Sequence, residues 1–173
     1  MSYITKDVRN ELFEEFETPK HIISHCNEVA RVATLIAKKL NEAGYSLNID
    51  VLRGAASVHD LVRLRERHDL ECAKILKDKG YPKESELVKN HMKYSPFNVV
   101  GDIDEQDLLC LADRIVLEDK YTGLEKRMEY IIEKVKDKND IVDIILGKKA
   151  ETKELIEGIE TKIGTTIDEL CEK

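Results

Sequence analysis

The sequence lacks any stretch that approaches the ~20 consecutive apolar residues of a membrane-spanning helix. Its first ten residues contain no apolar core of the kind that a secretion signal carries, so we expect a cytoplasmic protein without a membrane association. Positive charge is not in excess either. The net charge at pH 7 is −7, which argues against broad nucleic-acid binding. A small anionic substrate remains compatible, because a local basic cluster can oppose the global sign.

The sequence also lacks the cysteine spacing of a thiolate metal site. Its four cysteines are far apart and no Cys-x-x-Cys occurs: Cys26, Cys72, Cys110 and Cys171. Three of them lie among apolar residues of predicted helices, which favours buried, reduced thiols over a thiolate zinc site.

No period-2 strand pattern is convincing, whereas helical periodicity is present in nearly every segment. The 173 residues, 42% hydrophobic and 36% charged, are typical of one globular domain or of one domain with an appended helix. We predict an all-α fold. Three helices are expected over residues 6–17, 68–79 and 82–92. Four more are expected from their start signals: one that begins at Thr18-Pro19 and ends near Gly44, one capped by Asp50, one that begins at Asp104, and one that begins at a Thr122–Glu125 capping box.

The C-terminal segment repeats apolar residues at helical spacing, at Leu155, Ile156, Ile159, Ile163, Ile167 and Leu170. We therefore expect a domain over residues 1–147 and an amphipathic helix over 148–173, which docks on that domain or forms a homodimer interface. Gly158 and Gly164 weaken this helix.

Four of the five histidines fall on the apolar side of a predicted helix, and two aspartates join them. The full set is His25, His59, Asp60, His68, His91 and Asp113. Burying an unpaired polar or charged group costs several kcal/mol, so such residues need partners. Taken singly, each histidine is more often a satisfied core residue. Taken together, on five helices, they favour a metal site, as helix bundles build it. His21 fits a solvated first turn.

Imidazole and carboxylate without thiolate suit Fe, Mn, Co, Ni or Zn. His25, His59, Asp60 and Asp113 would hold one divalent ion and leave positions open for water or substrate. His68 and His91 allow a second ion, with Asp60 as the bridge. Two such ions clamp a phosphoryl group and lower the pKa of a water molecule between them.

The ordered series His, His-Asp, His, His, Asp resembles the HD superfamily of metal-dependent phosphohydrolases, in particular its small stand-alone bacterial members. The resemblance covers roughly residues 18–127. It extends to the amino-acid sequence around each predicted ligand, in the segments Thr18–Ala33, Gly54–Leu61, Arg67–Ala73, Val88–Met92 and Leu109–Val116. Arg63 stands where relatives often carry lysine.

The resemblance implies an HD-domain helical bundle that hydrolyses a phosphate ester or anhydride, with a nucleotide or another small phosphorylated metabolite as substrate. It also implies that Asp60 handles the proton of the attacking water. A mixed-valent di-iron oxygenase on the same ligands and a non-catalytic nucleotide-binding module are the alternatives.

Basic residues near the predicted ligands are candidates for binding the phosphate. Arg63 is the best of them and is expected to help catalysis by neutralising charge, with Arg67 and Lys93 as further candidates. The alternative is that the arginines stay solvated beside a helix end. Arg114 cannot face the same way as Asp113 on a helix, so we expect it to be structural. Tyr94, Pro96 and Phe97 are candidates for a lid or a stacking wall.

Overall fold

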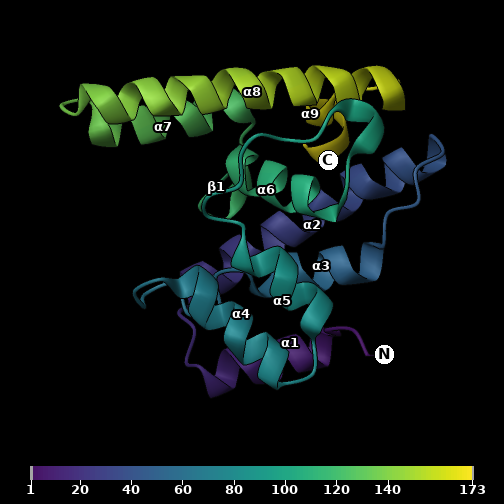
Figure 1. The fold of residues 1–173 in the computed structure, drawn as a ribbon, viewed down its shortest axis with the longest axis vertical. Coiled ribbons are helices and arrows are strands. Elements are labelled where there is room, and N and C mark those ends of the chain that lie inside the picture. Colours follow the sequence, from purple (N-terminus) through teal and green to yellow (C-terminus); the bar gives the residue numbers. More distant parts are fainter. Residues whose placement is uncertain (1, 173) are drawn as a thin grey trace.

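The computed structural model describes residues 2–172, and within them the fold is all-α apart from one minimal hairpin (Figure 1). In chain order the elements are α1 (Lys6–Glu15), α2 (Lys20–Glu42), α3 (Ile49–Val58), α4 (His68–Asp78), α5 (Pro82–Lys89), the 3-10 helix η1 (Val100–Asp102), α6 (Glu105–Ile115), β1 (Val116–Leu117), β2 (Lys120–Tyr121), α7 (Leu124–Val135), α8 (Asn139–Ile163) and α9 (Ile167–Cys171). The predicted fold class is thus confirmed.

Helix α2 forms the centre of the core and contacts α3, α6, the hairpin, α8 and α9. An apolar row along this helix is buried throughout: Ile22, Cys26, Val29, Ala33, Ile36, Ala37 and Leu40. The row follows the 3-4 spacing that places side chains on one helix face, so one helix can pack against neighbours from both halves of the chain. All four cysteines are buried and free, as expected.

Four predicted helix starts are confirmed and three are wrong in detail. Helices α1 and α4 begin at Lys6 and His68, as predicted. Asp104 begins α6 with a reciprocal capping box to Asp107, and Pro82 opens α5. The side chain that caps α3 belongs to Asn48 rather than Asp50, and α7 follows Gly123 without a side-chain cap. Thr18 does not cap α2 either.

The Thr18 hydroxyl instead donates to the carbonyl of Leu61, 2.8 Å away, in the turn that follows the His-Asp pair. Several polar residues near each helix start can serve as a cap, and tertiary contacts decide among them. The expectation of no strand also fails at β1 and β2, which pair Val116 with Tyr121 and Leu117 with Lys120. Strands of two residues are too short to show an alternating pattern.

The last two long helices, α7 and α8, lie side by side and extend beyond the rest of the molecule (Figure 1). We call α7 together with residues 139–147 of α8 the arm. The expected boundary at 147/148 falls inside α8, so a division there would cut a continuous helix. The near-continuous apolar run Ile141–Leu146 does not form a single apolar stripe on the helix, and three of its apolar residues are exposed: Ile141, Ile144 and Leu146.

Beyond the arm, α8 packs on the body through buried Thr152, Leu155 and Ile159. Arg114 fixes this arrangement, since its guanidinium donates to the Thr152 hydroxyl (3.0 Å) and to the Tyr94 carbonyl (2.6 Å). Its structural role agrees with the expectation. Among residues 2–172, no helix has both the length and the apolar composition to cross a membrane.

Candidate metal centre

The fold brings all six predicted ligands together from segments far apart in the sequence. His25 lies on α2, His68 is the first residue of α4, and Asp113 lies on α6. His59 and Asp60 follow the end of α3, and His91 follows the end of α5. Two of the histidines therefore sit just past a helix end, whereas the sequence pattern placed them within helices.

The four imidazoles form a continuous row. Ring centroids are 5.3 Å apart for His25 and His59, 5.2 Å for His59 and His91, and 5.4 Å for His91 and His68. Fully buried Ala55 and the carbonyl of Ala56 lie one turn before His59 on α3. Small side chains there let α2 and α3 approach closely, which draws the rings together.

Asp60 lies between the two ends of this row. Its Oδ2 atom is 3.9 Å from Nε2 of His25 and 3.8 Å from Nε2 of His59. Its Oδ1 atom is 3.1 Å from Nε2 of His68 and 3.4 Å from Nε2 of His91. Two groups suited to a metal ion therefore share one carboxylate, with a separate oxygen turned toward each.

Asp113 adds a second carboxylate to the first group only. Its Oδ1 atom is 3.0 Å from Nε2 of His25 and 3.5 Å from Nε2 of His59. The first group then has four candidate ligands and the second has three. The two groups follow the division expected from the sequence, in which His68 and His91 serve a second ion.

The buried ring nitrogens that face the carboxylates lack hydrogen-bond partners. Among the described residues, this applies to Nε2 of His59, His68 and His91. An unsatisfied buried nitrogen costs free energy, and a metal ion would satisfy several at once. The donor set therefore fits a divalent transition metal.

Backbone carbonyls fix the tautomer of three of these histidines. A carbonyl oxygen can only accept, so Nδ1 of His25 donates to Glu118 (2.7 Å), Nδ1 of His59 to Ala56 (2.7 Å) and Nδ1 of His91 to Val88 (2.6 Å). A neutral ring that donates through Nδ1 keeps the lone pair on Nε2, where a metal would bind.

His68 is held differently. Its Nδ1 lies 3.4 Å from Nη1 of Arg63. A guanidinium can only donate, so Nδ1 accepts and the proton of the neutral ring stays on Nε2, next to Asp60. A metal in the second group must displace that proton.

The same cluster shifts the pKa values of its members. Burial favours the neutral form of His59, but the Asp60 carboxylate, together with Cys26 and the Asp113 carboxylate, outweighs burial and raises the pKa of His59 well above its usual value. Burial alone would raise the pKa of both aspartates, but His59 and its neighbouring imidazoles hold the pKa of Asp60 and of Asp113 far below the usual range. A metal would replace protons on the imidazoles, so metal binding should weaken as pH falls.

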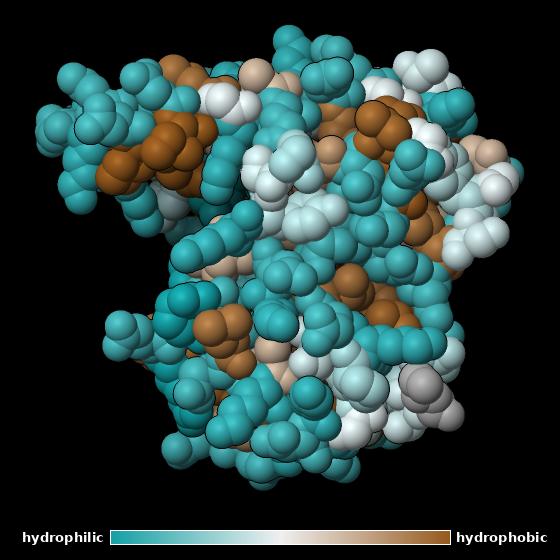
Figure 2. Space-filling view, viewed as in Figure 1, coloured by the Kyte–Doolittle hydropathy of each residue, from teal (hydrophilic) through white to brown (hydrophobic). Residues whose placement is uncertain are grey.

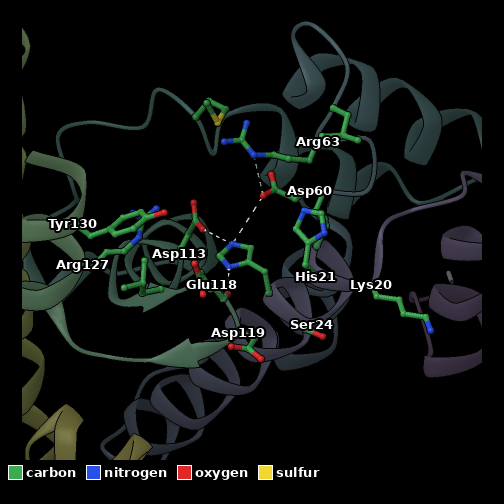
Figure 3. Close-up of a pocket in the computed structure, with 15 residues that line it drawn as sticks. Lys20, His21, Ser24, Asp60, Arg63, Asp113, Glu118, Asp119, Arg127 and Tyr130 are labelled. Atoms are coloured by element: carbon green, nitrogen blue, oxygen red, sulfur yellow. Dashed lines mark hydrogen bonds and ion pairs between the residues drawn. The ribbon is translucent and has the colours of Figure 1, made fainter. Parts of the chain in front are cut away.

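A cavity of about 620 Å³ opens onto the first group (Figure 3). It is lined by His25, Asp60 and Asp113, and among other residues by Lys20, His21, Ser24, Arg63, Leu64, Met92, Glu118, Asp119, Arg127 and Tyr130. Nε of Arg63 lies 3.5 Å from Oδ2 of Asp60, and 47% of the Arg63 side chain is exposed. Arg63 can therefore reach a ligand in the cavity.

Two other residues that were predicted to bind the substrate lie away from this cavity. Arg67 and Lys93 do not line the cavity, and the guanidinium of Arg67 pairs with the carboxylate of Asp69 at 3.3 Å. Phe97, a candidate for a stacking wall, packs instead beneath the Arg114 guanidinium, whose central carbon is 4.5 Å from the ring centroid.

Sequence reasoning missed several residues of the cavity. His21 stands four residues before His25, a spacing that places both on one face of α2 and was available as a signal. Arg127 and Tyr130 lie on α7, and no local pattern in the sequence connects that helix with the ligands. The backbone carbonyl of Glu118, which orients His25, carries no signal in its residue type.

The comparison with known families agrees with this geometry. The family model described as HD domain matches residues 22–118, which is more than half of the chain and spans all six predicted ligands. The chain belongs to the HD family. Its members are mostly metal-dependent hydrolases that bind divalent metals. No curated protein and no solved structure matches the chain.

Proposed function

We propose that this HD protein is a phosphohydrolase that cleaves a phosphate ester or anhydride of a small metabolite, with a nucleotide as the leading candidate. The observation that carries the proposal is the pair of ligand groups that share Asp60 on the floor of an open cavity. Membership of the HD family supports the reaction class.

Six residues would hold the metal: His25, His59, Asp60 and Asp113 one ion, and His68 and His91 with Asp60 a second. Divalent ions bound there would lower the pKa of a water molecule and neutralise charge on the phosphate. The candidates remain Fe, Mn, Co, Ni and Zn, in line with nitrogen and oxygen ligands.

Asp60 and Arg63 have different roles in this proposal: Asp60 orients the attacking water, and Arg63 binds the phosphate. The carboxylate of Asp60 is held ionised by the imidazoles around it, so it accepts a hydrogen bond from the attacking water and orients it. Arg63, beside Asp60 and partly exposed to the cavity, donates to the phosphate oxygens. Arg67 and Lys93 have no part in it.

The size and charge of the cavity support a small phosphorylated substrate. Its volume lies in the range that holds metabolites and cofactors. Lys20, Arg63 and Arg127 bring positive charge to its walls, and four carboxylates also line it: Asp60, Asp113, Glu118 and Asp119. A divalent ion held by Asp60 and Asp113 would offset their charge, so that the basic side chains and the ion together attract an anion although the chain carries a net charge of −7.

The test combines elemental analysis of the purified protein with a screen for phosphate release. The panel contains phosphomonoesters and nucleotides, each with added Mn²⁺, Co²⁺, Ni²⁺, Fe²⁺ or Mg²⁺. We expect bound metal and metal-dependent turnover, both lost in Asp60→Asn. Asp50→Asn, an equal change at an exposed position on α3, should retain both.

Two other outcomes would each favour a different function. Iron with dioxygen consumption and no phosphate release would favour the oxygenase. Tight nucleotide binding without turnover, under all metals, would favour a binding module. A protein that binds no metal would contradict the site itself.

A further inference from the structure

Helix α7 closes one side of the cavity, although it lies outside the segment matched to the HD family. The surface is hollowed between the arm and the body of the molecule (Figure 2), and the loop between α3 and α4 lies across the hollow from α7 (Figure 1). Arg127 and Tyr130, three residues apart on one face of α7, both line the cavity.

Among the residues that the structure describes, the guanidinium of Arg127 has no hydrogen-bond or ion-pair partner. All eight arginines of the chain lie within the described residues, and the other seven each hydrogen-bond or pair with a side chain or carbonyl. Nε of Arg127 is buried as well, so it is a donor without an acceptor. Leaving a charged donor unsatisfied costs free energy that a bound anion would recover.

The position of Arg127 relative to the ligands indicates what that anion is. Figure 3 shows Arg127 and Tyr130 on one side of the cavity and Arg63 beside Asp60 on the other, with Asp113 between the two sides. A phosphate above the ligand cluster would therefore meet a guanidinium on each side. One planar guanidinium group can donate two parallel hydrogen bonds to two oxygens of a phosphate, and the ammonium group of lysine lacks this geometry.

Exposed apolar side chains form part of the cavity lining. Leu64 is 78% exposed and Met92 is 44% exposed, and both line the cavity together with the ring of Tyr130. One side of that ring faces Lys134, whose Nζ lies 4.2 Å from the ring centroid. Exposed apolar side chains around a charged pocket suit a substrate with a phosphate at one end and a flat apolar group at the other.

We propose that α7 supplies the wall of the cavity that recognises the substrate: Arg127 binds the phosphate from the side opposite Arg63, and Tyr130, with Leu64 and Met92, packs against a planar ring esterified to it. This inference rests on the proposed function for the orientation of the substrate. The anion site on Arg127 can be tested without any turnover.

The first experiment measures the binding of inorganic phosphate to the metal-loaded protein by titration calorimetry. Arg127→Gln should weaken phosphate binding about tenfold or more, because it removes charge-assisted hydrogen bonds. Arg127→Lys should restore part of the loss. Lys126→Gln removes the same charge from an exposed neighbouring position on α7 and should bind like the wild type. Thermal melting of each variant checks the fold.

The second experiment compares an aromatic ester, p-nitrophenyl phosphate, and a nucleoside monophosphate with glycerol phosphate. Tyr130→Ala should raise KM for the two ring-bearing substrates about tenfold and leave KM for glycerol phosphate nearly unchanged, since base–aromatic stacking is lost only for the former. Tyr130→Phe keeps the ring and should behave like the wild type.

The outcomes separate this inference from the proposed function. Phosphate binding that is absent in the wild type, or unchanged in Arg127→Gln, would overturn the role of Arg127 whether or not the protein is a hydrolase. An equal rise in KM for all three esters in Tyr130→Ala would overturn the role of Tyr130. Phosphate binding that depends on Arg127, without hydrolysis of any ester, would support the anion site and contradict only the hydrolase.

Discussion

At the scale of single residues, Asp60 connects the two halves of the candidate metal centre. Its two oxygens face different pairs of histidines, at 3.1–3.4 Å on one side and 3.8–3.9 Å on the other. Asp113 and His91 each belong to one half only. The structure thus predicts different losses of metal for changes at the shared residue and at a residue of one half.

We expect Asp60→Asn to lose metal from both groups. An amide presents one oxygen and one NH₂ donor, so it cannot offer an anionic oxygen to each side. Elemental analysis should find little metal in the variant, and circular dichroism should show that its helices persist. Metal content equal to that of the wild type would contradict the bridging role.

His91→Ala is expected to remove only the second ion. It deletes a ligand of the His68 side, whereas His25, His59 and Asp113 stay in place. If the wild type binds two ions per chain, the variant should bind one. His21→Ala, which removes an exposed imidazole of the cavity wall, is the control and should retain both. A full complement of two ions in His91→Ala would show that the six-ligand assignment is wrong.

At the scale of elements, the small hairpin of β1 and β2 positions His25. The carbonyl of Glu118, in the turn between the strands, accepts from Nδ1 of His25. Glu28, one turn further along α2, holds the hairpin by accepting from the backbone N–H of Tyr121 at 3.0 Å. The same carboxylate accepts two hydrogen bonds from Arg31, at 2.7 and 2.8 Å.

We expect Glu28→Gln to lower the free energy of unfolding at pH 7 by about 2 kcal/mol, since hydrogen bonds to charged groups are lost. The Arg31 hydrogen bonds, opposed by partial burial, lower the pKa of Glu28 below its usual 4.5. A carboxyl with a lowered pKa in the folded state stabilises the protein above its unfolded pKa, and that contribution disappears as pH falls through the folded pKa.

Urea unfolding at pH 7 and at several values below 4.5 measures this dependence. The difference between wild type and Glu28→Gln should shrink as the pH falls. Glu11→Gln, at an exposed position on α1, should show no comparable difference at any pH. A gap that stays constant with pH would mean that the ionised carboxylate is not the source of the stability.

At the scale of the whole molecule, α8 connects the arm with the body. Gly158 of this helix lies against Val100 of η1, and a Cβ placed on Gly158 would come within 2.2 Å of a Val100 methyl carbon. The glycine that weakens α8 as an isolated helix therefore lets α8 dock. Gly164 ends the helix in the left-handed conformation at φ 71°, which glycine adopts without strain.

Gly158→Ala is therefore expected to destabilise the protein by about 1–3 kcal/mol, the usual cost of overpacking, although alanine favours helices. Gly147→Ala is a matched control on the same helix, since nothing lies within 4 Å of its added Cβ. It should stabilise by up to about 1 kcal/mol through helix propensity. Thermal or urea unfolding of the two variants gives the comparison, and equal shifts in the same direction would contradict the contact.

The cluster of candidate metal ligands was predictable because each of these residues is an exception in its local context. His25, His68 and Asp113 interrupt apolar helix faces, and the cost of burying them applies wherever the helices pack. Helix ends were less predictable, as at Thr18 and Asn48, because neighbouring polar residues compete for the cap at similar free energy. Arg67 and Arg63 look alike in the sequence, but only Arg63 reaches the cavity.

The sequence by itself determined the helical class, the apolar row of α2, the six residues of the candidate metal centre and, through its motifs, the family. These depend on periodicity and on the cost of burying polar groups, which are properties of short segments. Only the tertiary structure decided that Asp60 turns one oxygen to each half, that Gly158 receives Val100, and that Arg127 and Tyr130 face the cavity. Such contacts depend on how helices far apart in the chain pack together, and no local pattern records that arrangement.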